Sequence, residues 1–319
     1  MSQHPRPLVS YVVPVFNEQE SIAMFYDTLC STISQREDLD FELVFIDDGS
    51  SDDSPALLAA FADEDPRVRT ILLSRNFGHQ AAVTAGMDAA RGDAVVVMDA
   101  DLQDPPAVSL ELIKAWEDGA EIAYAQRVSR NDKASKRLAA HAYYRVLRRL
   151  SDVDIPADTG DFRLMDRRVV DEVNAMREPH RFLRGMVAFV GFNQVGVPFE
   201  RDARYAGESK YPLRKMIQLA ADGIISFSTV PLRLILATGY AFSGLAFIGI
   251  IYAVLMKFFA PEITVEGWTF MVISVLLMGG VQLIMLGIIG AYVGRIYTSS
   301  QGRPLYIARD GSSAPVRDA

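Results

Sequence analysis

Between residues 8 and 126, short apolar runs alternate with longer stretches in which apolar residues recur every three or four positions. The short runs are rich in Val, Ile, Phe and Tyr, which is typical of buried strands, and the longer stretches predict helices. Strands that alternate with helices favour an α/β fold with a mostly parallel sheet and helices on both faces. We predict strands at 8–16, 41–46, 68–73, 93–98 and 121–126, and helices ending near residues 35, 62, 90 and 118.

The pattern changes after residue 127. The segment 133–150 is basic and amphipathic, and it fits either a helix packed on the sheet or a helix lying on an anionic membrane surface. Beyond it we predict a turn and short strand at 158–165, helices at 167–176 and 182–189, and extended chain at 194–205.

Two uncharged apolar runs, 234–256 and 267–294, dominate the C-terminal third of the chain. Each is longer than the ~20 residues that cross the ~30 Å hydrocarbon core of a bilayer, so we predict a hairpin of two transmembrane helices. The amphipathic residues just before them predict interfacial helices. The predicted domains are an α/β domain at 1–211, a juxtamembrane segment at 212–232, two transmembrane helices within 233–296 (about 234–256 and 268–294), and a tail at 297–319.

The charges that flank the two apolar runs predict the orientation of the hairpin. Glu262 and Glu266 lie in the loop between the runs, beside Lys257, whereas arginines precede the first run and follow the second. The positive-inside rule then places the α/β domain and both termini in the cytoplasm, in a multi-pass protein of the inner (cytoplasmic) membrane. Glycines at 279, 280, 287, 290 and 294 would allow close helix packing, so a homo-oligomer is possible.

Composition narrows the choice of partners and compartment. The net charge of −8 argues against a nucleic-acid partner. A single cysteine, Cys30, excludes an intramolecular disulfide and fits a reducing compartment. The polar N-terminus lacks the apolar core of a secretory signal.

Polar residues gather where the predicted strands end. The carboxyl ends of parallel strands are where ligands collect in sheets of this kind, so these residues should lie near one another. They are Pro14, Glu18, Asp47, Asp48, Asp99, Asp101 and Arg127.

Asp99 and Asp101 directly follow the buried strand at 93–98. Two acids one residue apart are, taken alone, more often a solvated turn than a ligand site. Carboxylates held close together also suit Mg²⁺ or Mn²⁺ carrying a phosphate, and the convergence of strand ends favours this second interpretation. His79 follows another strand-to-helix turn, where a nucleotide contact and a capping or packing role both remain open.

The motifs together resemble those of family 2 glycosyltransferases with the GT-A (Rossmann-like) fold, in the branch that uses polyprenyl phosphates. The resemblance spans nearly all of the first 212 residues. It rests on VVPVFNEQESI, VFIDDGSSDDS, LSRNFGHQAAVTAGMDAARGD, VVMDADLQDPP, Ala125-Gln-Arg127, DTGDFRLMDRR and GESKYP.

This resemblance implies inverting transfer of a single hexose from a nucleotide sugar to undecaprenyl or another polyprenyl phosphate, for modification of cell-surface glycans or lipids. The implied donor contacts are Pro14, Phe16, Glu18, Asp47, Asp48, Asp99, Ala100 and Gln103, with Asp99 and Asp101 as metal ligands. The implied acceptor-phosphate contacts are Arg127, Arg137, Ser209 and Lys210.

Asp158 or Asp161 occupies the place of a catalytic acid residue in this branch, and the resemblance does not choose between these two aspartates. Arg127 and Lys210 are the other implied catalytic residues. A phosphate monoester has a second pKa of about 6, so the acceptor is already largely anionic at neutral pH and gains little from a strong base.

Three alternative functions share some of these features. A processive polysaccharide synthase would carry a Gln-x-x-Arg-Trp motif, which neither Trp116 nor Trp268 provides. Transfer of mannose from GDP-mannose and a non-catalytic membrane-anchored binding or scaffold protein both remain open. UDP-glucose is preferred because the tail and DTGDFRLMDRR look most like bactoprenol glucosyltransferases.

Overall fold

The computed structural model describes residues 6–127, 159–179, 181–199 and 268–309, together with parts of 235–251. The predicted basic helix at 133–150 and the segment 200–234 lie outside these residues. Four candidate site residues do so as well: Arg137, Asp158, Ser209 and Lys210.

A seven-stranded sheet forms the centre of the α/β domain, in the order β3-β2-β1-β4-β6-β5-β7. The described strands and helices of the α/β domain match their predicted positions within a few residues, whereas α10 (Trp268–Ser300) continues six residues beyond its predicted end at 294, into the segment predicted as the tail. The strands are β1 (Leu8–Val15), β2 (Asp40–Asp47), β3 (Val68–Leu72), β4 (Ala94–Val97), β5 (Ile122–Arg127), β6 (Thr159–Asp166) and β7 (Gln194–Phe199). The helices are α1 (Ile22–Ile33), α2 (Ser54–Glu64), α3 (His79–Ala89), α4 (Pro106–Glu117), α6 (Arg167–Ala175), α7 (Leu183–Phe189) and α10 (Trp268–Ser300).

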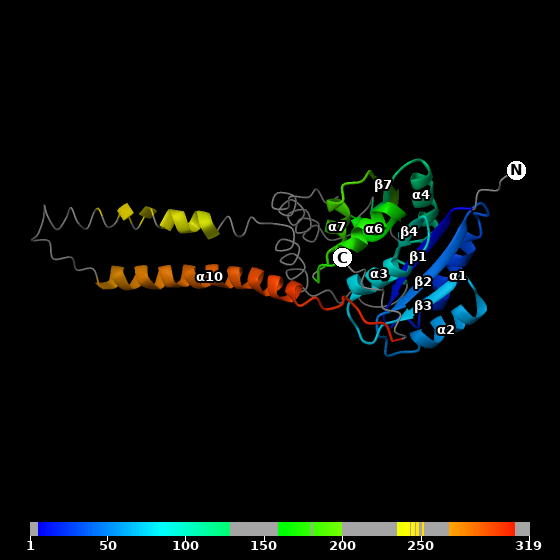
Figure 1. Cartoon of the computed structure of the whole chain (residues 1–319), viewed down its shortest axis with the longest axis horizontal. Coiled ribbons are helices and arrows are strands. Elements are labelled where there is room, and N and C mark those ends of the chain that lie inside the picture. The colour runs from blue at the N-terminus through cyan, green and yellow to red at the C-terminus, as the bar shows by residue number, and fades with distance from the viewer. Residues whose placement is uncertain are drawn as a thin grey trace, which may run out of the picture.

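Helices cover both faces of the sheet, as predicted, because successive strand residues point to opposite sides. Val13 of β1 and Phe45 of β2 pack with α1, α2 and α4, whereas Val12 and Ile46 pack with α3, α6 and α7. Figure 1 shows the two helical layers on either side of the strands. Gly86 lets α3 approach closely, since a Cβ there would lie 2.3 Å from a methyl carbon of Val12.

β6 interrupts an otherwise parallel sheet. It pairs antiparallel with both β4 and β5, with Val97 of β4 opposite Arg163. The expected mostly parallel sheet is confirmed, and β6 is the exception that the sequence did not predict. Because β6 runs against β4, its first residues lie at the carboxyl ends of the parallel strands.

α10 is long, apolar and exposed, and it extends away from the sheet (Figure 1). Its segment Leu277–Ser300 is the one candidate membrane span among the described residues, and none of that window is buried. Leu283 and Ile284 expose 72% and 68% of their surface, which favours a lipid environment over water. Residues 235–242 are also helical, while the complete two-helix hairpin remains a prediction.

The tail that follows α10 returns to the sheet and covers the edge of β3. Ala308 pairs antiparallel with Leu73, and the amide of Ser74 donates to the carbonyl of Ile307 at 2.8 Å. The hydroxyl of Tyr306 donates to Asp88 at 2.9 Å, inside the layer formed by α3 and α6. The tail therefore ties the end of α10 directly to the α/β domain, which the sequence did not predict.

We expect Tyr306→Phe to loosen this attachment. Tyr306 is 6% exposed, and loss of its hydrogen bond to Asp88 should cost about 1 kcal/mol, because Asp88 keeps its ion pair with Arg177. Hydrogen exchange should accelerate at the amides of Ser74 and Arg309. Tyr297→Phe, at a residue 64% exposed on α10, is the matched control, and equal exchange in both variants would contradict the attachment.

Candidate active site

The structure brings most of the predicted site residues to one edge of the sheet. β1, β2 and β4 are neighbours and run parallel, so the segments after Val15, Asp47 and Val97 emerge together. β5 runs in the same direction, which places the backbone of Arg127 at this edge. β6 starts here and contributes Asp161.

The turn after β4 holds two carboxylates close to solvent. Asp99 is 40% exposed, and Asp101 accepts a hydrogen bond from the amide of Gln103 at 3.0 Å. Leu102 has a φ of 57°, a left-handed conformation that costs a leucine of the order of 1–3 kcal/mol. Its side chain packs on the core beneath, as does Ala100, which is 2% exposed. The turn is thus held in a strained shape by its packing.

Asp99 and Asp101 suit a divalent cation that is shared with a diphosphate. No group of three or more His, Cys, Asp or Glu side chains within the described ranges is arranged to hold a metal ion. Mg²⁺ commonly binds one or two carboxylates and takes its remaining ligands from substrate phosphates and water. Two half-exposed carboxylates on one turn therefore fit such an ion.

The loops after β1 and β2 are joined by hydrogen bonds. Asn17 has a φ of 54°. Its backbone N–H donates to the Ser50 hydroxyl at 2.9 Å, and its side-chain oxygen accepts the backbone N–H of Ser51 at 2.8 Å. The amide of Glu18 donates to the Ser54 hydroxyl at 3.0 Å. Phe16, at the end of β1, is left 46% exposed. An exposed ring beside a fixed loop is a surface on which a planar base can stack.

Asp47 and Asp48 both turn their carboxylates into the protein. Asp47 is fully buried and accepts the amide of Ser50, whereas Asp48 accepts the amides of Phe77 and Gly78 at 2.7 and 2.9 Å. Burial and the charge of Asp47 raise the pKa of Asp48. The two hydrogen bonds lower this pKa, but they do not outweigh the increase. Asp48 therefore fixes the loop between β3 and α3, and the nucleotide contacts of both acids remain predictions.

His79 contacts the first acid of the turn. Its Nε2 lies 2.8 Å from Oδ1 of Asp99. The N-cap of α3 is Gly78, so His79 is not the capping residue. Burial lowers the pKa of His79, but the hydrogen bond and charge of Asp99 outweigh it and leave that pKa raised. The sequence left its role open, and the structure assigns it a contact with Asp99.

Asp161 forms an ion pair with Arg184 of α7. Nε and Nη2 of Arg184 lie 2.8 and 3.3 Å from the two carboxylate oxygens. Burial alone would raise the pKa of Asp161, but the positive charge of Arg184, with lesser help from His79 and Arg163, holds it well below its usual range. An acid held in this way is a weak base and serves better as a counterion. Arg184 was not predicted as a site residue, because no local pattern in the sequence links it to Asp161.

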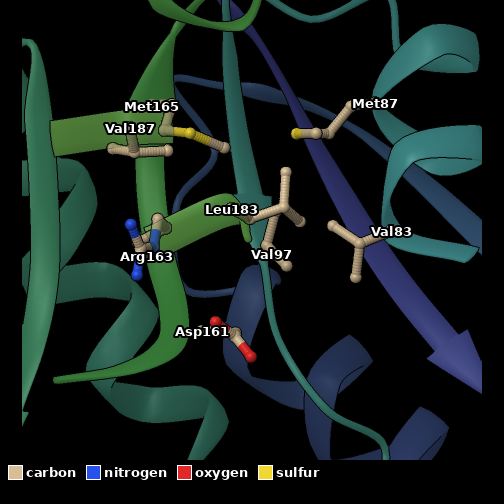
Figure 2. Close-up of a pocket in the computed structure, with 8 residues that line it drawn as sticks. All are labelled: Val83, Met87, Val97, Asp161, Arg163, Met165, Leu183 and Val187. Atoms are coloured by element: carbon tan, nitrogen blue, oxygen red, sulfur yellow. The ribbon is translucent and has the colours of Figure 1, made fainter. Parts of the chain in front are cut away.

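Apolar side chains lie on one side of Asp161. A small pocket beside Asp161 and Arg163 is lined otherwise by six apolar residues of α3, β4, β6 and α7 (Figure 2). Arg163 is 6% exposed and donates to the carbonyl of Gly160, and burial lowers its pKa to about 10. The apolar lining explains why these charges are costly to bury and must balance one another.

The chain is similar to known sugar-transferring proteins. Residues 10–173 match the family model described as "Glycosyl transferase family 2". The chain is 46% identical over 310 residues to the uncharacterized glycosyltransferase YkcC of Bacillus subtilis (strain 168), covering 97% of this chain and 95% of the relative. It is 39% identical over 305 residues to the bactoprenol glucosyl transferase of Shigella phage SfV, covering 95% and 98%.

The similarity to solved structures is weaker than the similarity to these two relatives. Glucosyl-3-phosphoglycerate synthase from Mycobacterium tuberculosis, solved with Mn²⁺, uridine diphosphate and glucosyl-3-phosphoglycerate, is 18% identical with a TM-score of 0.44. The match covers 69% of this chain and 78% of that chain.

Proposed function

The chain belongs to glycosyl transferase family 2 and is a glycosyltransferase, and from this premise we propose that it transfers one hexose from a nucleotide sugar to polyprenyl phosphate. The observation that carries the proposal is the similarity to bactoprenol glucosyl transferases over nearly the whole length of both chains, including α10. We propose UDP-glucose as the donor and undecaprenyl phosphate as the acceptor on the same ground.

The proposed reaction is a single displacement at the anomeric carbon. An oxygen of the lipid phosphate forms a bond to that carbon, while the bond from the carbon to the diphosphate breaks and the nucleoside diphosphate leaves. The configuration is inverted because the new bond forms on the face opposite to the leaving group. Holding the two substrates in line supplies much of the rate enhancement, since the nucleophile is already anionic.

Asp99 and Asp101 are proposed to hold Mg²⁺ or Mn²⁺ together with the diphosphate, with Gln103 beside them. Bound there, the cation neutralises negative charge on the leaving group. The hydrogen bond from the Gln103 amide keeps Asp101 oriented at the turn. Two half-exposed carboxylates on a rigid turn support this proposal more strongly than their spacing in the sequence did.

The nucleotide is proposed to lie across the ends of β1, β2 and β4. Pro14, Phe16 and Glu18 would line the base, and Ala100 would lie beneath the diphosphate. Asp47 and Asp48 would help mainly through the loops that they fix, with Asp48 nearest to the base or ribose. The exposed Phe16 ring and the joined loops after β1 and β2 support this placement.

The lipid phosphate is proposed to be guided by Arg127, Arg137, Ser209 and Lys210. Arg127 ends β5 at the same edge as Asp99, which supports its part. The other three lie outside the described residues. We propose that Asp161 does not act as a base, because Arg184 holds both of its oxygens. Asp158 remains the alternative candidate for the catalytic acid residue.

We propose that the chain is anchored by two transmembrane helices, at about 234–256 and 268–294. The domain at 1–211 and both termini would then face the cytoplasm, and 212–232 would lie at the interface. The exposed apolar surface of α10 supports the second helix, and the docked tail keeps its C-terminal end beside the α/β domain. Homo-oligomer formation remains a prediction.

A panel of labelled nucleotide sugars tests the donor. Full-length protein would be incubated with undecaprenyl phosphate, Mg²⁺ or Mn²⁺, and one each of UDP-glucose, UDP-galactose and GDP-mannose. We expect label in the lipid fraction from UDP-glucose and a rate at least ~10-fold lower from the others, since a mismatched hydroxyl leaves polar groups in the site unpaired. Faster transfer from GDP-mannose would overturn the proposed donor.

A further inference from the structure

The loop that carries His79 is fixed at three separate points. At its start, the amide of Ser74 donates to the tail carbonyl of Ile307 at 2.8 Å. At its end, Asp48 accepts the amides of both residues that precede His79. In between, Gly49 packs so tightly that a Cβ there would lie 2.5 Å from the carbonyl carbon of Arg75. The backbone position of His79 is therefore set by contacts with the loop that follows β2 and with the tail.

The imidazole ring of His79 is held as well. The amide of Leu183, at the start of α7, donates to Oε1 of Gln80 at 2.9 Å. The oxygen of the Gln80 side-chain amide therefore faces Leu183. Its NH₂ group faces the imidazole ring and lies 3.5 Å from Nδ1 of His79. In the neutral ring Nδ1 is then the acceptor, and in either protonation state Nε2 carries the proton donated to Asp99 at 2.8 Å.

We propose that His79 is a positioning residue, whose Nε2–H holds Asp99 of the turn in the orientation that binds a divalent cation. The proposal rests on the function proposed above, in which Asp99 and Asp101 are the cation ligands. His79 occupies Oδ1 of Asp99 and leaves Oδ2 for the cation. Hydrogen bonds to a ligating carboxylate restrict its rotation, and their loss typically costs 10–100-fold in metal affinity.

The direct test is Mn²⁺ binding to the full-length protein in detergent, measured by electron paramagnetic resonance without nucleotide or lipid. We expect His79→Ala to raise the Kd for Mn²⁺ about 10-fold. His79→Gln should restore it to within ~3-fold of wild type, because the Gln amide nitrogen can donate from nearly the same place. Asn76→Ala, at an exposed side chain of the same loop, is the control and should leave the Kd unchanged.

Steady-state kinetics give the second measurement. At saturating Mn²⁺ the kcat of His79→Ala should approach that of wild type, with the loss confined to the Mn²⁺ concentration needed for half-maximal rate. A fall in kcat that saturating Mn²⁺ does not relieve would overturn the positioning role, as would equal weakening of Mn²⁺ binding in the Ala and Gln variants.

Asp101→Asn separates failure of this inference from failure of the proposed function. If Asp101→Asn abolishes Mn²⁺ binding and His79→Ala leaves it unchanged, His79 has no positioning role and the proposed metal site stands. If Asp101→Asn binds Mn²⁺ as wild type does, the proposed metal site itself is wrong.

Discussion

Replacing Asp101 with asparagine is expected to lower sugar transfer at least ~100-fold, because the variant loses half of the negative charge proposed to hold the cation at the leaving diphosphate. The amide keeps the size of the carboxylate, and its oxygen can still accept the hydrogen bond from the Gln103 amide. The turn should therefore keep its shape. The measurement is the initial rate of label transfer to lipid at saturating donor and Mg²⁺.

Asp118→Asn is the matched control for this experiment. Asp118 is an exposed carboxylate that ends α4, and its loss should leave the rate within ~2-fold of wild type, as is usual for a surface change. Both variants should unfold at the wild-type temperature. A rate in Asp101→Asn within a few-fold of wild type would refute the assigned role of the turn.

Replacing Arg184 with leucine is expected to destabilise the protein by about 2–4 kcal/mol, because it leaves the buried Asp161 carboxylate with only the weaker attraction of Arg163 and His79. The Asp161 side chain is only 15% exposed, with apolar residues beside it. Adding Asp161→Asn to Arg184→Leu should recover much of the loss, since the neutral amide has no charge to bury. Thermal unfolding of the three proteins in detergent measures both effects.

Acid provides an independent check on the same pair. The folded-state pKa of Asp161 is lowered, so its ion pair stabilises the folded protein above the ordinary aspartate pKa of about 3.9. This stabilisation is lost as the pH falls from there through the folded-state pKa. Wild type should lose more stability than Arg184→Leu below about pH 4. Arg168→Leu, which removes the exposed ion pairs of Arg168 with Glu121 and Asp166, is the control and should lower the unfolding temperature far less than Arg184→Leu does. A double variant no more stable than Arg184→Leu would contradict the buried pair.

Local patterns were enough to predict the elements of the fold. The apolar run at Val95–Val97 and the helical spacing after Pro106 each depend on residues close in sequence, so their positions were predicted to within a few residues. The gathering of strand-end acids followed from the parallel sheet alone. These two features contain most of the candidate site.

What the sequence did not predict depends on contacts between distant residues. β6 pairs with β4 across an intervening strand and helix, and no local spacing indicates that it runs antiparallel. The pairs His79–Asp99 and Asp161–Arg184 join residues on different elements, as does the docking of Ala308 on Leu73. The sequence also did not indicate that the carboxylates of Asp47 and Asp48 turn inward, because their partners Ser50, Phe77 and Gly78 lie in loops whose shape depends on the fold.

Identification of the released nucleotide tests the central claim most directly. In the proposed reaction the bond between the anomeric carbon and the diphosphate breaks. The full-length protein, given UDP-glucose and undecaprenyl phosphate, should therefore release UDP in equal amount to the glucose that enters the lipid. Chromatography of the nucleotide fraction and mass spectrometry of the lipid would measure both. Release of UMP with a sugar phosphate on the lipid, or glucose transfer that does not require undecaprenyl phosphate, would contradict the account.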